Sequence, residues 1–360
     1  MSDDEIFLLH ALPGGNGDAL VVEYGKPGLT HRVLVDGGVA KSALAVGEFL
    51  GDDAALELMV VTHIDNDHIA GVLKLFDRDH PPVPEQVWFN GYRHLPETGV
   101  EPMGPVEGEL LTTLIDGRFN WNGAFDEGPV VVEPTAAPAR SLTGGLRLTV
   151  LSPGLEQLRV LRQKSTWTEV VREAGTDPNV PPPEPEPLTS GLERMGAPDV
   201  AALAAQHTTE DSAPANGSTI ALLVEYAKRS CLLAGDAHPS VLIAGIDALV
   251  GPEGVLEVDV FKLPHHGSKA NVTVELMSRV RAQTYVFSTD GTGRQSHPND
   301  QAVARVIVHG GPSPLLVFNY RSTRNAVWED PTLKDAHGYR TRYPLEGTAG
   351  ITVDLMDVPG

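Results

Sequence analysis

The chain has 360 residues, of which 48 are acidic and 27 are basic, and its net charge is −21. This balance disfavours broad binding to duplex DNA, which needs a positively charged footprint. The single cysteine, Cys231, excludes an internal disulfide and an all-cysteine zinc site, and its apolar neighbours predict a buried position. No apolar run reaches the roughly 18 residues of a membrane helix, and no signal peptide is evident. We therefore expect a globular, cytoplasmic protein without membrane association.

Apolar runs bounded by Gly, Pro and polar residues predict strands, and longer amphipathic runs predict helices. In chain order, the expected strands cover residues 6–12, 19–24, 33–35, 58–62, 87–89, 146–152, 219–226, 229–234, 258–263, 284–288 and 315–319. The expected helices cover residues 41–51, 69–76, 155–174, 239–250 and 272–280. This alternation predicts a layered α/β fold.

Residues 175–215 differ in character, because Pro181–Pro187 alternates proline with glutamate. Such a run favours an extended or disordered segment. We therefore predict a single domain over residues 1–360, with a partly irregular, Pro-rich insertion at about 155–215. The insertion would cover the cleft or serve as a docking surface.

Four side chains that can bind metals, His63, Asp65, Asp67 and His68, directly follow the apolar run over residues 58–62. Imidazole suits zinc, and carboxylates suit harder ions such as manganese. Mixed donors at this density predict a two-metal hydrolytic centre, although a polar loop that solvates the strand end would have the same composition.

Three further motifs follow later strands. Asp236 closes the apolar run at 229–234, His265 and His266 follow the strand at 258–263, and His297 lies downstream of the strand at 284–288. Each motif alone is common in turns. Together they lie at strand ends, where open α/β sheets build their sites.

These motifs, in this order, resemble those of the metallo-β-lactamase superfamily, and most of all its ComEC-like branch of stand-alone hydrolases. The resemblance runs from about residue 8 to about residue 300. It implies a four-layer αββα sandwich with the metals between the two sheets. Supporting marks are Gly17-Asp18, Asp36-Gly37-Gly38, Ser152-Pro153 and Asn216-Gly217-Ser218.

The resemblance also implies a ligand set for two divalent ions, Zn²⁺ or Mn²⁺. His63 and Asp65 would hold one ion, Asp67 and His68 would hold the other, and Asp236 would bridge both. The resemblance leaves the last ligand open between two neighbours. His266 is the expected ligand of the second ion, and His265 is its neighbour or a substrate contact.

Two acidic residues are expected behind the ligands. Asp36 would accept a hydrogen bond from a ligand imidazole, and Asp18 would do the same or cap its own turn.

The chain departs from the superfamily pattern at two positions. Asp65 stands where most members have a second histidine, and the usual isolated histidine before the bridging aspartate is missing. Asn216 and Ser218 occupy roughly that place and are expected behind the ligands or against substrate, while His207 is an alternative substitute. An oxygen-richer shell shifts the preference toward manganese and leaves zinc open.

The implied chemistry is attack by a hydroxide that two metal ions activate. Asp67 would orient the hydroxide, and His297 or His265 would protonate the leaving group or bind a phosphoryl oxygen. We predict a phosphodiesterase or nuclease acting on a nucleotide or single-stranded nucleic acid, because bound metals supply the positive charge that the chain lacks. The alternatives are a lactonase, an esterase or a cyclic-nucleotide phosphodiesterase. A non-catalytic, metal-stabilised partner in a multi-protein bacterial system is a further alternative.

Overall fold

The computed structural model describes residues 5–52, 55–96, 106–163, 197–292 and 296–358. Its main feature is a pair of stacked β-sheets. The first sheet has its antiparallel strands at one side and its parallel strands at the other. In spatial order its strands are β17 (Ile351–Asp354), β1 (Ile6–Ala11), β2 (Leu20–Lys26), β3 (Leu29–Val35), β5 (Leu58–Val60), β7 (Gln86–Trp88) and β8 (Asn120–Trp121).

The second sheet combines the same two kinds of pairing. Its strands from β16 to β12 run parallel, and those from β12 to β9 run antiparallel. In spatial order they are β16 (Arg340–Arg342), β15 (Leu315–Phe318), β14 (Val280–Phe287), β13 (Leu256–Lys262), β12 (Arg229–Leu233), β11 (Ala221–Tyr226), β10 (Arg147–Ser152) and β9 (Ala139–Ser141). A small parallel pair, β4 (Ala55–Leu56) and β6 (Val83–Pro84), forms a separate two-stranded sheet.

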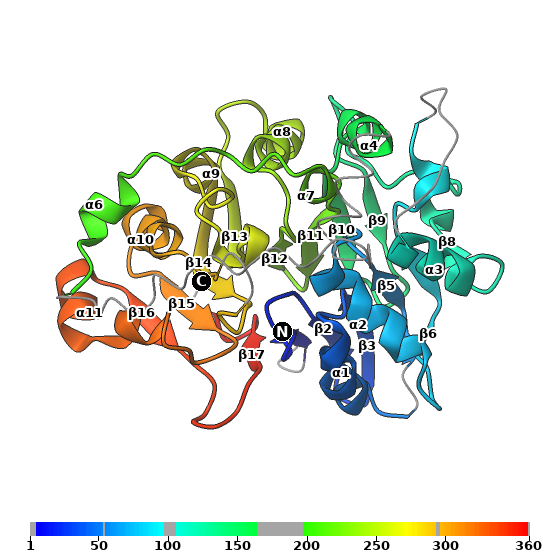
Figure 1. Cartoon of the computed structure of the whole chain (residues 1–360), viewed down its shortest axis with the longest axis horizontal. Helices are drawn as coiled ribbons and strands as arrows, with labels where there is room; N and C mark the ends of the chain where they lie inside the picture. Colours follow the sequence, from blue (N-terminus) through cyan, green and yellow to red (C-terminus); the bar gives the residue numbers. More distant parts are fainter. Residues whose placement is uncertain (1–4, 53–54, 97–105, 164–196, 293–295, 359–360) are drawn as a thin grey trace, which may run out of the picture.

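Helices cover the outer face of each sheet (Figure 1). An apolar cluster joins the first sheet to α1 (Ala43–Leu50), α2 (Asn66–Phe76), α3 (Val106–Ile115) and α4 (Leu155–Arg162). Another joins the second sheet to α6 (Val200–Ala204), α8 (Pro239–Val250), α9 (Val274–Arg279), α10 (Asp300–His309) and α11 (Pro331–His337). The third cluster lies between the sheets and contains Cys231, as expected. The predicted four-layer αββα sandwich is therefore confirmed.

The helix expected over residues 69–76 begins earlier, at Asn66. Asp65 has an extended backbone and is the residue before the helix, so Asp67 and His68 lie in the first helical turn. An acidic side chain there suits the positive end of the helix dipole. The first turn thus carries two of the predicted ligands.

The stretch predicted to be irregular contains two short helices in its described part, α6 and α7 (Pro214–Gly217). Asp199 caps α6 by accepting a hydrogen bond from the backbone N–H of Ala202, and Val200 and Ala204 are buried in the cluster that includes α10. Capping and burial account for α6, while residues 206–213, between the two helices, form neither helix nor strand. The run Pro181–Pro187 and most of the helix expected over 155–174 lie outside the described residues.

The strand expected over 284–288 is longer and begins at Val280, because Val280 and Ala282 add two more inward-facing positions. Short 3₁₀ turns occur at Ala40–Ser42, Tyr92–His94, Gly123–Phe125, Pro264–Gly267 and Ala326–Glu329. In the part of the chain that the structure describes, no helix combines the length and the apolar character needed to cross a bilayer.

Candidate metal centre

The predicted ligand clusters meet at one edge of the two sheets. β12, β13 and β14 are parallel neighbours, so their carboxyl ends place Asp236, His265, His266 and His297 along the same edge. β3 and β5 are also parallel, and the loop after β5 brings His63 to this edge from the other sheet. The centre therefore lies where strand ends of both sheets converge.

The two carboxylate oxygens of Asp236 face different donors. Oδ1 lies 3.3 Å from His68 Nε2 and 3.5 Å from His266 Nε2. Oδ2 lies 3.9 Å from His63 Nε2 and 3.7 Å from His265 Nε2. Donors bound to one ion at about 2.0–2.2 Å are separated by roughly 3–4 Å. Each oxygen is therefore spaced to share an ion with its neighbours.

Two more carboxylates lie beside the imidazoles that face Asp236. Asp67 Oδ2 lies 3.6 Å from His266 Nε2, and Asp65 Oδ2 lies 3.6 Å from His63 Nε2. We call Asp67, His68 and His266 the Oδ1 group, and His63 with Asp65 the Oδ2 group. The structure thus brings together all six residues predicted as metal ligands.

The donor atoms fit a divalent cation. Nε2 of His63, His68 and His266 and Oδ1 of Asp236 are buried and make no hydrogen bond. A buried polar atom without a hydrogen bond costs about 1–3 kcal/mol, so four such atoms around one carboxylate indicate missing cationic partners. Divalent ions would satisfy them, and nitrogen and oxygen donors without sulfur suit zinc or manganese.

The opposite nitrogen of each of these three imidazoles is already engaged. His68 Nδ1 lies 2.7 Å from Asp36 Oδ2, and His266 Nδ1 lies 3.0 Å from the carbonyl oxygen of Ser288. His63 Nδ1 lies 2.9 Å from the hydroxyl of Thr62. These contacts fix the ring orientations and leave Nε2 as the free donor.

Asp36 organises the rear of the centre. It accepts hydrogen bonds from the backbone N–H of Thr62 at 2.8 Å and from its hydroxyl at 2.7 Å. Because the same hydroxyl contacts His63 and the same carboxylate contacts His68, Asp36 orients both imidazoles. This is the kind of position that the sequence predicts for Asp36.

Charge in the centre is balanced by close pairing. Burial disfavours the charged form of His68, but the carboxylates of Asp236 and Asp36 outweigh burial and raise the pKa of His68 well above its usual range. Burial also opposes ionisation of Asp236, yet the neighbouring imidazoles hold the pKa of that carboxyl well below its usual range. Bound metal ions would replace these protons as the balancing positive charge.

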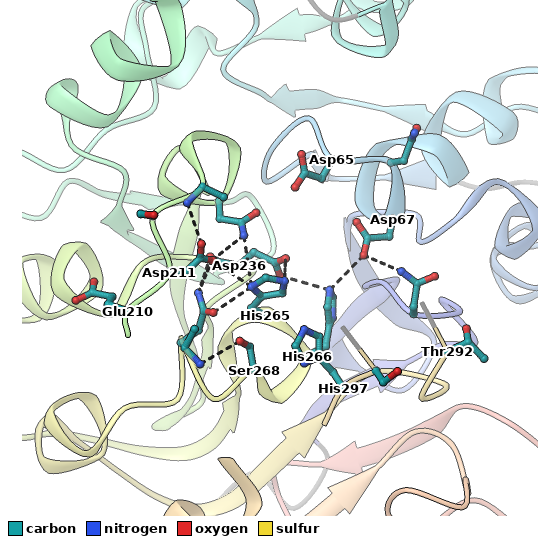
Figure 2. A pocket seen from close by; sticks show the side chains of 18 of the residues that line it. Asp65, Asp67, Glu210, Asp211, Asp236, His265, His266, Ser268, Thr292 and His297 are labelled. Carbon is teal, nitrogen blue, oxygen red and sulfur yellow. Dashed lines mark hydrogen bonds and ion pairs between the residues drawn. The ribbon is translucent and has the colours of Figure 1, made fainter. Parts of the chain in front are cut away.

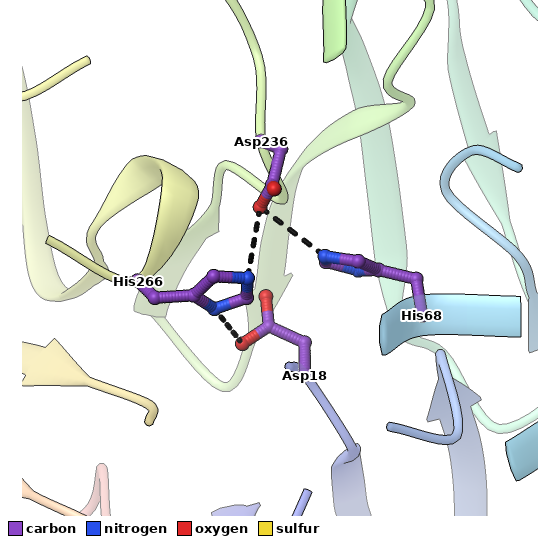
Figure 3. A group of neighbouring side chains, drawn as sticks. All are labelled: Asp18, His68, Asp236 and His266. Atoms are coloured by element: carbon purple, nitrogen blue, oxygen red, sulfur yellow. Dashed lines mark ion pairs between the residues drawn. The ribbon is translucent and has the colours of Figure 1, made fainter. Parts of the chain in front are cut away.

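Asp18 also belongs to the buried cluster (Figure 3). Asp18, His68, Asp236 and His266 offer donor atoms within 4.8 Å of one another. Asp18 forms an ion pair with the buried ammonium of Lys262, and its Oδ1 lies 3.3 Å from His266 Nδ1. Against the opposing effect of burial, Lys262 holds the pKa of Asp18 below its usual range. Asp18 therefore contacts His266 at Nδ1, whereas Asp236 faces its Nε2.

His265 and His266 form an unusual turn at the end of β13. Both have left-handed backbone angles, with φ of 47° and 56°, and their ring planes are 81° apart. A left-handed residue other than glycine costs about 1–3 kcal/mol, so two in succession persist only where the surrounding contacts hold them. The turn lets adjacent residues reach opposite oxygens of Asp236.

The remaining predicted residues occupy different places. His297 is buried, with its ring centroid 4.9 Å from that of His265, and burial and the neighbouring imidazoles lower its pKa well below the usual range. Asn216 lines the cavity, whereas the hydroxyl of Ser218 donates to the carbonyl of Ala215 and is absent from the lining. His207 is exposed and does not reach the cavity.

A cavity of about 700 Å³ opens over the donors (Figure 2). Asp65 and Asp67 lie at one side and Glu210 and Asp211 at the other, with Asp236 between them. Among the lining residues that the structure describes, none is Lys or Arg. The described wall is therefore rich in carboxylates and histidines and contains neither lysine nor arginine.

Three contact residues escape the sequence analysis. Asn16 donates to Asp67 Oδ2 at 3.0 Å, Lys262 neutralises Asp18, and Asp211 contacts His265. In the sequence, only the glycine-rich turn that holds Asn16 could have indicated a close contact. In the structure, Gly17 packs against Asp67, and a Cβ added to Gly17 would lie 1.7 Å from the Asp67 carbonyl oxygen.

The chain was compared with protein families, curated proteins and solved structures. No protein-family model matches the chain, and no curated protein matches it significantly. The metallo-β-lactamase fold protein YhfI from Bacillus subtilis is similar at 9% identity and a TM-score of 0.43, over 98% of this chain and 100% of YhfI. CmlA, a diiron β-hydroxylase from Streptomyces venezuelae, is similar at 12% identity and a TM-score of 0.41, over 99% of this chain and 55% of CmlA. The ComEC-like branch stays a prediction.

The Lys262–Asp18 pair predicts a large loss of stability on removal of the lysine. Lys262→Met leaves the buried Asp18 carboxylate without its ammonium partner and should lower the free energy of unfolding by about 3–5 kcal/mol. Urea denaturation measures the change. Lys26→Met is the matched control, because Lys26 is 62% exposed and its ion pair with Glu5 is worth about 0–1 kcal/mol. Equal losses in the two variants would contradict the role of the buried pair.

The contacts of Asp36 predict an effect on metal affinity. Asp36→Asn removes the charge that orients His68 and, through Thr62, His63, so metal affinity should fall by about 10–100-fold. Isothermal titration with Zn²⁺ and Mn²⁺ measures this change. Asp259→Asn is the control, since Asp259 binds Arg229 outside the cavity. Unchanged affinity in Asp36→Asn would show that Asp36 does not support the ligands.

Proposed function

We propose that this protein is a metal-dependent hydrolase that cleaves phosphodiesters with a pair of Zn²⁺ or Mn²⁺ ions. The observation that carries the proposal is the placement of Asp236 between two donor groups, one facing each carboxylate oxygen. In this proposal the Oδ1 group holds one ion, the Oδ2 group holds the other, and Asp236 bridges them. Ions bound there would lower the pKa of a shared water and polarise the scissile group.

Asp67 is the residue best suited to orient the attacking water. Its side chain is 25% exposed and lines the cavity, so it is within reach of substrate and solvent. The amide of Asn16 holds its Oδ2, which fixes the direction of the carboxylate. A fixed carboxylate at this position accepts the proton of the nucleophile with little reorganisation.

His297 is suited to bind a substrate oxygen. It lines the cavity beside His265 and His266, and its lowered pKa keeps the imidazole neutral near pH 7. A neutral imidazole donates one hydrogen bond without carrying a full positive charge. We therefore assign His297 to a phosphoryl oxygen or the leaving oxygen.

The cavity favours a small substrate over a polymer. Its volume of about 700 Å³ lies in the range of small-molecule sites, roughly 300–1,000 Å³. A long nucleic-acid strand carries one charge per nucleotide and would meet a described wall with carboxylates and no Lys or Arg. A nucleotide, or the end of a single strand, places one phosphodiester group at the centre.

The same wall supports a second candidate substrate class. A neutral lactone or carboxyl ester needs no cationic side chains, and metal ions held by the Oδ1 and Oδ2 groups would polarise its carbonyl oxygen as well as a phosphoryl oxygen. The attacking water and the role of Asp67 would be unchanged. Only the substrate contacts would differ.

Removal of Asp67 tests the proposed mechanism. Asp67→Ala should lower the turnover of bis-p-nitrophenyl phosphate with Mn²⁺ by at least about 100-fold, because both water orientation and one ligand are lost. Release of p-nitrophenol measures the rate, with far-UV circular dichroism as the check on folding. Glu257→Ala is the control, since Glu257 is exposed on β13 and absent from the cavity. Turnover equal to that of the wild type would refute the mechanism.

A substrate panel separates the two candidate classes. The metal-loaded protein is assayed on bis-p-nitrophenyl phosphate, a dinucleotide, labelled single-stranded DNA, γ-butyrolactone and p-nitrophenyl acetate. We expect the highest kcat/KM for the two small phosphodiesters and slower cleavage of long DNA. A higher kcat/KM for the lactone or the acetate would instead support the second class. Stoichiometric metal binding without turnover of any substrate would favour a non-catalytic partner.

A further inference from the structure

The Oδ2 group has fewer donors than the Oδ1 group. With Asp236 included, the Oδ1 group offers four protein donors, whereas His63, Asp65 and Asp236 make three. We propose that His265 is the fourth donor of the Oδ2 group and that Asp211 is a positioning residue that fixes its ring. This inference rests on the proposed function, because it presumes that metal ions bind at the centre.

The geometry of His265 supports the assignment. Its Nε2 lies 3.7 Å from Asp236 Oδ2, while Nε2 of its neighbour His266 lies 3.5 Å from Oδ1. The backbone N–H of His265 donates to the carbonyl of Gly235, which ties the turn to the loop that carries Asp236. The two adjacent histidines therefore address opposite sides of the same carboxylate, and only His266 is needed by the Oδ1 group.

The other ring nitrogen of His265 lies nearest to two acceptors. Nδ1 is 3.0 Å from Asn271 Oδ1 and 3.2 Å from Asp211 Oδ2. The amide nitrogen of Asn216 is farther away, at 3.4 Å, and donates at 2.7 Å to Asp211. With the proton on Nδ1, Nε2 keeps a lone pair that points toward Asp236. The arrangement repeats that of His68 and Asp36, in which a carboxylate holds Nδ1 and leaves Nε2 for a metal.

Asp211 is itself held rigidly. Its Oδ2 accepts hydrogen bonds from the side-chain amides of Asn216 at 2.7 Å and Asn271 at 3.0 Å. Its Oδ1 accepts from the backbone N–H of Ala213 at 2.9 Å. Asn216, which stands near the position of the histidine missing from the motif, thus holds Asp211 by a hydrogen bond. In this proposal His265, which follows β13, takes the place of the missing histidine as a donor, and the hydrogen bonds of Asp211 hold its ring.

A buried arginine fixes the segment that carries Asp211. Arg305 is 2% exposed and donates to the carbonyls of Lys269 and Val272 at 2.6 and 2.9 Å. It also donates to the carbonyl of Gln206 at 2.6 Å and to the hydroxyl of Thr208 at 3.0 Å. Arg305 therefore joins the stretch before Asp211 to the loop that contains Asn271, and both reach His265 together.

Metal titration tests the inference. The wild-type protein should bind two Mn²⁺ ions, measured by isothermal titration and by elemental analysis after desalting. His265→Ala should keep one tight ion and weaken the other by at least about 100-fold, and Asp211→Ala should weaken the same ion by about 10–100-fold. Asp259→Asn is the control for metal binding, because Asp259 binds Arg229 outside the cavity. It should leave both affinities unchanged.

Anomalous diffraction from Mn²⁺-soaked crystals gives a second readout that does not depend on activity. We expect one ion within about 2.0–2.3 Å of His265 Nε2 and loss of that anomalous peak in His265→Ala. Two ions of unchanged affinity in His265→Ala and Asp211→Ala would overturn this inference alone. A wild-type protein that binds no metal would refute the proposed function as well. Should His265→Ala fail to fold, His265→Gln and Asp211→Ala carry the same test.

Discussion

The buried carboxylate of Asp236 is the constraint on which the centre depends. It is 2% exposed, and burying a charge without partners is costly, so four imidazoles gather around its two oxygens. Two of these imidazoles come from the loop and helix after β5 in the first sheet, and two come from the turn after β13 in the second. The centre can therefore form only when both sheets are packed together.

Behind the donors lies a second set of contacts that removes their freedom. Asp36 holds His68 directly and His63 through Thr62, while the carbonyl of Ser288 holds His266. Each imidazole is fixed through Nδ1, so Nε2 points toward Asp236. This preorganisation means that a metal ion would meet donors already in place, with little ordering cost.

The charge of the cavity wall bears on the proposed substrate. The described wall of the cavity contains carboxylates and no Lys or Arg, so the positive charge for an anionic substrate would come from bound metals. The buried Lys262 does not change this balance at the wall, because Asp18 neutralises it. This distribution is the physical reason to expect a small substrate with few charges.

The sequence by itself determined the fold class and the ligand types. Strand periodicity, and motifs such as His63 and Asp236 at strand ends, are local signals that survive without tertiary contacts. Only the tertiary structure revealed the partners of these residues, because such contacts join distant segments. Asp18 meets Lys262 across 244 positions, and Asp211 meets His265 across 54. No local pattern records how two loops pack, so the supports of the centre had to come from the folded chain.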